Sequence, residues 1–175
     1  MQHLTKEQIA AVLEWAKADP RLHLMITLAW RHGLRASEVC SLRVKDIDLA
    51  GFITVQRLKG SLRTTQPLFP EEKLVLATLC TDRRPAEYLF PGRFSGHITR
   101  QVFFLGFQKA CQEAGIPAHL AHPHALKHTT GMTVIQKGIE NARQYLGHKS
   151  IASTGAYLKV SDQEASRAAA AAFGD

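Results

Sequence analysis

The chain has 175 residues, 45% hydrophobic and 21% charged, the balance of a globular protein with one domain or two small lobes around a core. Its formal charge of +7 suits a polyanionic partner such as nucleic acid, although many basic proteins bind none. Three cysteines without C-x-x-C spacing argue against a disulfide framework and for a reducing compartment. There is neither a long apolar run nor a signal-peptide pattern, so we expect a cytoplasmic protein without a membrane partner.

The N-terminal residues carry the pattern of two successive helices. Thr5-Lys6-Glu7-Gln8 is a capping box, and the apolar residues after it recur at helical spacing to about Ala18. Asp19-Pro20 is expected to end this helix, and a second helix is expected from about Leu22 to His32.

Arg35 follows a helix stop at Gly33 and precedes a helix that should begin near Ser37-Glu38. Two roles fit this arginine. It can pair with Glu38 or cover an edge of the core, or its planar guanidinium can clamp two oxygens of a phosphate. Glu38 is expected to hold the start of the helix or to orient Arg35 rather than to react.

After Val44 the apolar period changes to two, which predicts an antiparallel hairpin. Its turn is expected at Lys59-Gly60-Ser61 and its returning strand from Leu62 to Leu68. Lys59 at the tip is either a solvated charge or a mobile ammonium with a functional role.

Two further helices are expected before the most informative stretch. Pro70 and the acidic residues after it begin a helix that continues to Cys80, and Thr99 caps an amphipathic helix from Arg100 to about Ala114. Three aromatic side chains of the latter helix are expected to face the core: Phe103, Phe104 and Phe107.

Four histidines within ten residues raise the question of a metal site: His119, His122, His124 and His128. His124 and His128 are four residues apart and can share a helix face. No acidic residue lies between them as in H-E-x-x-H, and no cysteine is near. We therefore expect no metal site, with a zinc-binding regulatory module as the alternative, and we expect His128 to support the fold beneath the site.

The residues from His122 to Tyr157 hold most of the chemistry. Helices are predicted from His124 to Lys137, from Asn141 to Gly147 and from Ser150 to Tyr157. The stretch combines a cation, two imidazoles and a tyrosine hydroxyl. Such a set suits attack on phosphate, which needs positive charge around its oxygens while a nucleophile approaches.

Motifs in a fixed order resemble the tyrosine recombinase (phage integrase) family. They are Gly33-Leu34-Arg35-Ala36-Ser37-Glu38-Val39, then Leu58-Lys59-Gly60, then His124-x-x-Lys127-His128, Leu146-Gly147-His148 and Tyr157. The resemblance covers Leu4 to about Ser161. It implies an α+β class, mainly α-helical with a small antiparallel β-sheet, which is the catalytic-domain fold of that family.

The resemblance also implies a mechanism of site-specific DNA cleavage and rejoining. Tyr157 would attack a scissile phosphodiester and form a 3′-phosphotyrosyl link, which a 5′ hydroxyl later reverses. Arg35 and Lys127 would neutralise the non-bridging oxygens, and His148 would donate a hydrogen bond to one of them.

Proton transfer and DNA contact are assigned by the same resemblance. His124 would carry the tyrosine proton, and Lys59 would protonate the leaving 5′ oxygen. No metal and no other cofactor is implied, because the cations do the electrostatic work. Three basic residues are expected to contact DNA: Arg57, Arg63 and Lys149.

One position departs from the family pattern, since Lys127 stands where the family has its second arginine. Lysine keeps the charge but loses the fork that binds two oxygens, so slowed rather than abolished cleavage is expected. The alternative function is a DNA-binding homologue with weak or lost catalysis. A type IB topoisomerase shares the chemistry, but the L-G-H box and the small size favour a recombinase.

Residues 1–175 are expected to form the catalytic domain, without the N-terminal core-binding domain that family members usually carry. DNA affinity should then be weak and salt-sensitive. The expected partner is double-stranded DNA, with a homotetramer on DNA, a monomer or weak oligomer without it, and a location at the nucleoid. Residues 161–175 begin with a second capping box and are expected to form a helix that docks on a neighbouring protomer, or a frayed tail.

Overall fold

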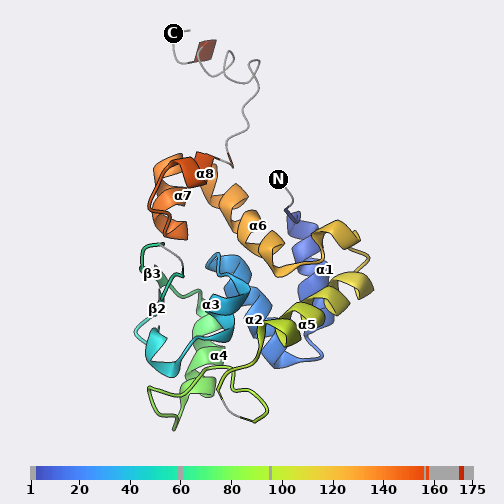
Figure 1. The fold of residues 1–175 in the computed structure, drawn as a ribbon, viewed down its shortest axis with the longest axis vertical. Helices are drawn as coiled ribbons and strands as arrows, with labels where there is room; N and C mark the ends of the chain where they lie inside the picture. Colours follow the sequence, from blue (N-terminus) through green and yellow to red (C-terminus); the bar gives the residue numbers. More distant parts are fainter. Residues whose placement is uncertain (1–2, 59–60, 95, 156, 158–169, 172–175) are drawn as a thin grey trace.

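Figure 1 shows the chain as a group of helices with one small sheet. The computed structural model describes residues 3–58, 61–94, 96–155, 157 and 170–171. Within these residues, short antiparallel strands pair in the order β1-β2-β3, so the expected α+β class is confirmed. The elements are α1 (Lys6–Ala16), α2 (Pro20–Arg31), α3 (Ala36–Cys40), β1 (Ile47–Asp48), β2 (Phe52–Val55), β3 (Thr64–Pro67), α4 (Pro70–Cys80), α5 (Arg100–Glu113), α6 (Pro123–Ile135), α7 (Ile139–Leu146) and α8 (Ala152–Gly155), with 3-10 turns at Val44–Asp46 and Ala118–Leu120.

The first two helices differ from expectation at their junction. The capping box of α1 is present, because Thr5 and Gln8 each accept a hydrogen bond from the other's backbone N–H. Helix α2 begins at Pro20 rather than at Leu22, since the Asp19 carboxylate accepts hydrogen bonds from the backbone N–H groups of Arg21 and Leu22. Asp19-Pro20 therefore starts the second helix, because proline at the first helical position removes an N–H that would have no partner there.

Helix α2 is the central helix, and it packs against α1, α3, α5 and α6. Its apolar residues from Leu24 to Ala29 are almost fully buried, as are Phe103 and Phe107 of α5. Phe104 was expected in the core and is instead partly exposed, because the helix turns by about 100° between adjacent residues and directs it away from Phe103. The core thus holds α2 rigidly beneath the connection to α3.

The buried face of the sheet combines apolar and polar side chains. Strand β2 pairs with β3 in the register Ile53↔Gln66 and Val55↔Thr64, and all four residues are buried. The returning strand is shorter than the range 62–68, and β3 contacts α7. Because Gln66 and Thr64 are polar and buried, this interface depends on hydrogen bonds.

Helix α7 ends in a tight turn that is hydrogen-bonded to the sheet hairpin. It begins at Ile139, two residues before the expected start, and Asn141 donates a hydrogen bond to the Lys137 carbonyl instead of capping the helix. Gly147 adopts a left-handed conformation with φ of 68°, and its carbonyl accepts a hydrogen bond of 2.8 Å from the Leu62 N–H. The turn therefore fixes where His148 leaves the helix.

Some predictions fall outside the described residues. These are Lys59 at the hairpin tip, the second capping box and most of the C-terminal segment 161–175. No helix in the described part of the chain is long and apolar enough to cross a membrane.

Gly147 and Gly115 form a matched pair for testing this turn, because both have φ of +68°. A Cβ atom on Gly147 would lie 2.5 Å from the Leu62 carbonyl oxygen, whereas one on Gly115 would meet nothing within 4 Å. We expect Gly115→Ala to lower the free energy of unfolding by about 1–2 kcal/mol, because a side chain disfavours positive φ. Gly147→Ala should lower it by about 3 kcal/mol or more, because the backbone at Leu62 must also move to make room for the added atom. Urea denaturation measures both, and equal losses would show that the turn does not depend on this close approach.

Candidate active site

Most of the predicted catalytic residues converge on one place. Arg35 precedes α3, His124 and Lys127 lie on α6, and His148 and Tyr157 follow α7 and α8. Electrostatic coupling links Lys127 to His124 and His148, and Arg35 to His124, His148 and Tyr157. The fold therefore brings together side chains that are up to 122 residues apart in the sequence. Lys59 lies outside the described residues.

Arg35 is held by Glu38 and remains partly open to solvent. Its backbone N–H and its Nη1 each donate a 2.8 Å hydrogen bond to the Glu38 carboxylate, and a third of its side chain is exposed. Glu38 is buried. Burial opposes ionisation, but hydrogen bonds from Arg35 and Leu58 and the charge of Arg57 hold the pKa of Glu38 below its ordinary value. Pairing with Glu38 thus orients Arg35 and leaves its outer edge available.

Arg57 was predicted to contact DNA, but in the structure it lies in the interior rather than on the surface. Its side chain is fully buried, with the guanidinium in contact with Glu38 at 3.3 Å. It also donates hydrogen bonds to the carbonyls of Gly33 at 2.8 Å, His32 at 2.9 Å and Tyr145 at 3.2 Å. A guanidinium fits here because its five N–H donors can satisfy several fixed carbonyls at once.

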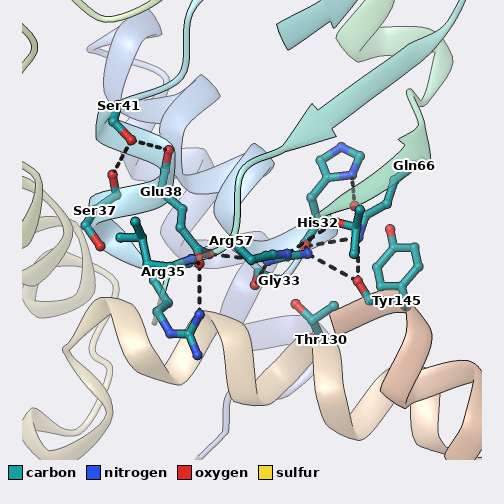
Figure 2. A network of polar contacts seen from close by, with 12 residues as sticks. His32, Gly33, Arg35, Ser37, Glu38, Ser41, Arg57, Gln66, Thr130 and Tyr145 are labelled. Carbon is teal, nitrogen blue, oxygen red and sulfur yellow. Dashed lines mark hydrogen bonds and ion pairs between the residues drawn. The ribbon is translucent and has the colours of Figure 1, made fainter. Parts of the chain in front are cut away.

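Figure 2 shows this arginine at the centre of a polar network that the sequence did not reveal. Gln66 donates a 2.7 Å hydrogen bond to the Tyr145 carbonyl and is 2.7 Å from the His32 ring, which lies 3.2 Å from Glu72. The period-two pattern of β3 places Gln66 on the same face as buried Thr64, which is the one sequence signal for it. No sequence pattern indicated the burial of Arg57, because its partners are Glu38 and backbone carbonyls that are remote in sequence.

Lys127 is the unusual member of the site. It is 3% exposed, and its Nζ is buried without a hydrogen-bond partner among the described residues. Burial, together with the positive charges of Arg57 and Arg35, lowers the pKa of its amine from 10.5 to about 7. A lysine in this state is close to losing its charge at neutral pH.

The histidines of the site are held as neutral rings. Burial, followed by the charges of Lys127 and Arg35, lowers the pKa of His148 to about 4, and its Nδ1 lies 3.0 Å from the Thr154 hydroxyl. The pKa of His128 is also lowered to about 4, first by burial and then by His124. His124 follows the same direction, chiefly because of burial. Neutral imidazoles can accept a proton or donate a hydrogen bond.

Tyr157 packs its ring into a space that α6 leaves open. A Cβ atom on Gly131 would lie 2.4 Å from the tyrosine ring, so only glycine at that position admits it. The ring lies almost parallel to His148 with centroids 6.5 Å apart and edge-on to His128 at 5.8 Å. Burial raises the pKa of the phenol, while Arg35 opposes that rise. The hydroxyl is therefore protonated at neutral pH and needs a base to react.

An open hollow of about 680 Å³ lies beside Arg35 and His124, and Arg100, Thr99 and Phe104 line its other side. Arg63 and Lys149 are exposed, so their predicted DNA contacts stay predictions. In the described part of the chain no group of three or more His, Cys, Asp or Glu side chains is arranged to hold a metal ion.

Comparison with known sequences gives relatives over most of the chain. The sequence profile described as "Phage integrase family" matches residues 2–164. The chain is 34% identical over 162 residues to the type 1 fimbriae regulatory protein FimB of Escherichia coli, which covers 86% of this chain and 80% of that protein. It is 33% identical over 166 residues to a tyrosine recombinase of Pseudothermotoga lettingae, covering 92% of this chain and 57% of that protein.

Solved structures share the fold at lower sequence identity. The XerA recombinase has a TM-score of 0.77 at 24% identity, covering 98% of this chain and 65% of that one. The Tn1549 transposon integrase in complex with transposon right end DNA has a TM-score of 0.78 at 18% identity, covering 99% of this chain and 66% of that one. The chain therefore spans about two thirds of each of these solved proteins.

Arg57→Met tests the buried network against Arg63→Met, which changes an exposed arginine of the same hairpin. We expect Arg57→Met to lower the free energy of unfolding by about 3–5 kcal/mol, because it removes the fully buried cation that pairs with Glu38 and the hydrogen bond to the Gly33 carbonyl. Arg63→Met should change it by less than about 0.5 kcal/mol. Similar losses in urea denaturation would show that the network contributes little.

Lys127→Met should stabilise the free protein, with exposed Lys149→Met as the control. Between pH 7 and about 10.4 the unfolded chain holds a proton on this amine that the folded chain has lost, so wild-type stability rises with pH there. The variant removes the free-energy cost of burying an ammonium. Its free energy of unfolding should therefore exceed that of the wild type most below pH 7, by on the order of a few kcal/mol, and the difference should shrink toward pH 10. An advantage that is independent of pH would contradict the lowered pKa.

Proposed function

Because the chain belongs to the phage integrase family and is a site-specific tyrosine recombinase, we propose that Tyr157 is the nucleophile with which it cleaves and rejoins DNA. The phenol oxygen attacks the scissile phosphorus, the 5′ oxygen leaves, and a 3′-phosphotyrosyl ester holds the strand. Attack by a 5′ hydroxyl reverses the step, so the energy of the bond is kept. The observation that carries this proposal is the position of Tyr157 beside His148, in the cluster that contains Arg35.

The surrounding side chains neutralise charge and transfer protons during this reaction. Arg35 and Lys127 offset the charge on the non-bridging oxygens, and His148 donates a hydrogen bond to one of them. His124 accepts the tyrosine proton, which suits an imidazole held neutral at working pH. Lys59 gives a proton to the leaving oxygen.

The partner is double-stranded DNA, and solved proteins of the same fold support this. One is XerH bound to its difH substrate, and another is a lambda integrase dimer bound to a core site. We assign backbone contacts to Arg63 and Lys149, and we expect assembly as a tetramer on DNA at the nucleoid. Residues 1–175 act as the catalytic domain, and their DNA affinity depends strongly on salt.

The second candidate function is a DNA-binding homologue with weak catalysis. It rests on Lys127, whose amine lacks both a partner and the fork of an arginine. The two functions differ in whether a covalent adduct forms.

Covalent trapping on a nicked suicide DNA substrate tests the proposal directly. A pool of sequences that includes DNA flanking the source gene serves as substrate, because the target sequence is unknown. We expect a protein–DNA adduct on a denaturing gel with the wild type and none with Tyr157→Phe, while DNA binding persists in both. Adducts that persist in Tyr157→Phe would exclude this nucleophile, and binding without any adduct would favour the second function.

A further inference from the structure

Within the part of the chain that the structure describes, the buried Lys127 Nζ has no hydrogen-bond partner. The carboxylate whose charge acts on it, Glu38, already accepts two hydrogen bonds on each oxygen. One oxygen serves the Arg35 Nη1 and the Leu58 N–H, and the other serves the Arg35 N–H and Arg57. A charged ammonium on Lys127 would therefore be a third cation in a buried space that holds one carboxylate.

The groups that face this amine come from every element around it. Arg35 and Glu38 belong to the start of α3, and Arg57 follows β2. The imidazoles come from α6 and from the turn after α7, and they are neutral at pH 7 because burial lowers their pKa: His124, His128 and His148. Among the described residues, the fixed charges that act on this amine are thus two guanidinium groups and one carboxylate.

We propose that Lys127 holds the scissile phosphodiester only as its ammonium, and that it takes up this proton from solvent when the phosphate enters the site. This inference rests on the proposed function and adds to it a proton that is bound together with DNA. The amine gains one proton, no covalent bond breaks, and the phosphodiester keeps its single negative charge. One incoming anion and one incoming proton leave the net charge of the cluster unchanged, so each favours the binding of the other.

An arginine at this position would behave differently. A guanidinium is protonated at every pH that a folded protein tolerates, so it binds phosphate without taking up a proton. Lys127→Arg is therefore the matched control, since it keeps the cation and removes the titration. The lowered pKa of the wild-type amine, about 7, places the coupling in the neutral range.

Nuclear magnetic resonance of the whole chain with 13C-labelled lysine measures the coupling. The Lys127 Cε signal is identified by its absence from the Lys127→Arg spectrum, and its pH titration is recorded with and without sodium sulfate. Sulfate is the probe because its charge is constant between pH 6 and 10, whereas inorganic phosphate itself titrates near neutral pH. The assay does not depend on a known DNA site or on cleavage.

We expect the free amine to titrate near pH 7 and saturating sulfate to raise the midpoint by at least about one unit. Sulfate affinity should fall about tenfold per pH unit between the two midpoints in the wild type and less than about twofold in Lys127→Arg. An amine that stays protonated to about pH 10 in the free protein, or a midpoint that sulfate leaves unmoved, would overturn the inference. Failure of the proposed function is seen separately, as the absence of a Tyr157-dependent adduct.

Discussion

The buried ion pair between Glu38 and Arg57 is the interaction on which the geometry of the site depends. Both side chains are fully buried, so separating either from its partner would leave a charge in a low-dielectric interior. The pair is tolerated because hydrogen bonds satisfy its remaining donors and acceptors, including the carbonyls of Gly33 and Tyr145. As Figure 2 shows, the pair links three parts of the chain that are remote in sequence. They are the loop between α2 and α3 that carries Arg35, the sheet hairpin and the end of α7.

The cations of the site outnumber its carboxylates among the described residues. Arg35 and Arg57 share Glu38, and the Lys127 amine has no hydrogen-bond partner there. The same cations and the burial keep His148 and His124 neutral, and burial keeps the Tyr157 phenol protonated. A phosphodiester entering this site would therefore meet several cations and a neutral imidazole beside Tyr157, the proposed nucleophile, and such a pre-arranged electrostatic environment favours phosphoryl chemistry.

The members of the family share this fold at low sequence identity, so the fold alone does not set the chemistry of a given member. In this chain Lys127 departs from the family motif, in which an arginine stands at this position. Lys127 exchanges a permanent guanidinium for an amine whose charge depends on its surroundings. Arg57 and Arg35 bind the same Glu38 carboxylate, so the buried pair helps to hold the partly exposed Arg35 guanidinium in its direction.

The sequence by itself determined the fold class, the helix starts at Lys6, Pro70 and Arg100 and the candidate chemical groups, because capping residues and motif spacing are local properties. It failed where a local signal had two meanings, as at Asp19-Pro20, which starts a helix rather than ending one. Only the tertiary structure decided that Arg57 is buried, that Gly131 makes room for Tyr157, and that Lys127 has no partner. These properties depend on distances between segments remote in sequence, and burial acts on charge only after the chain has packed.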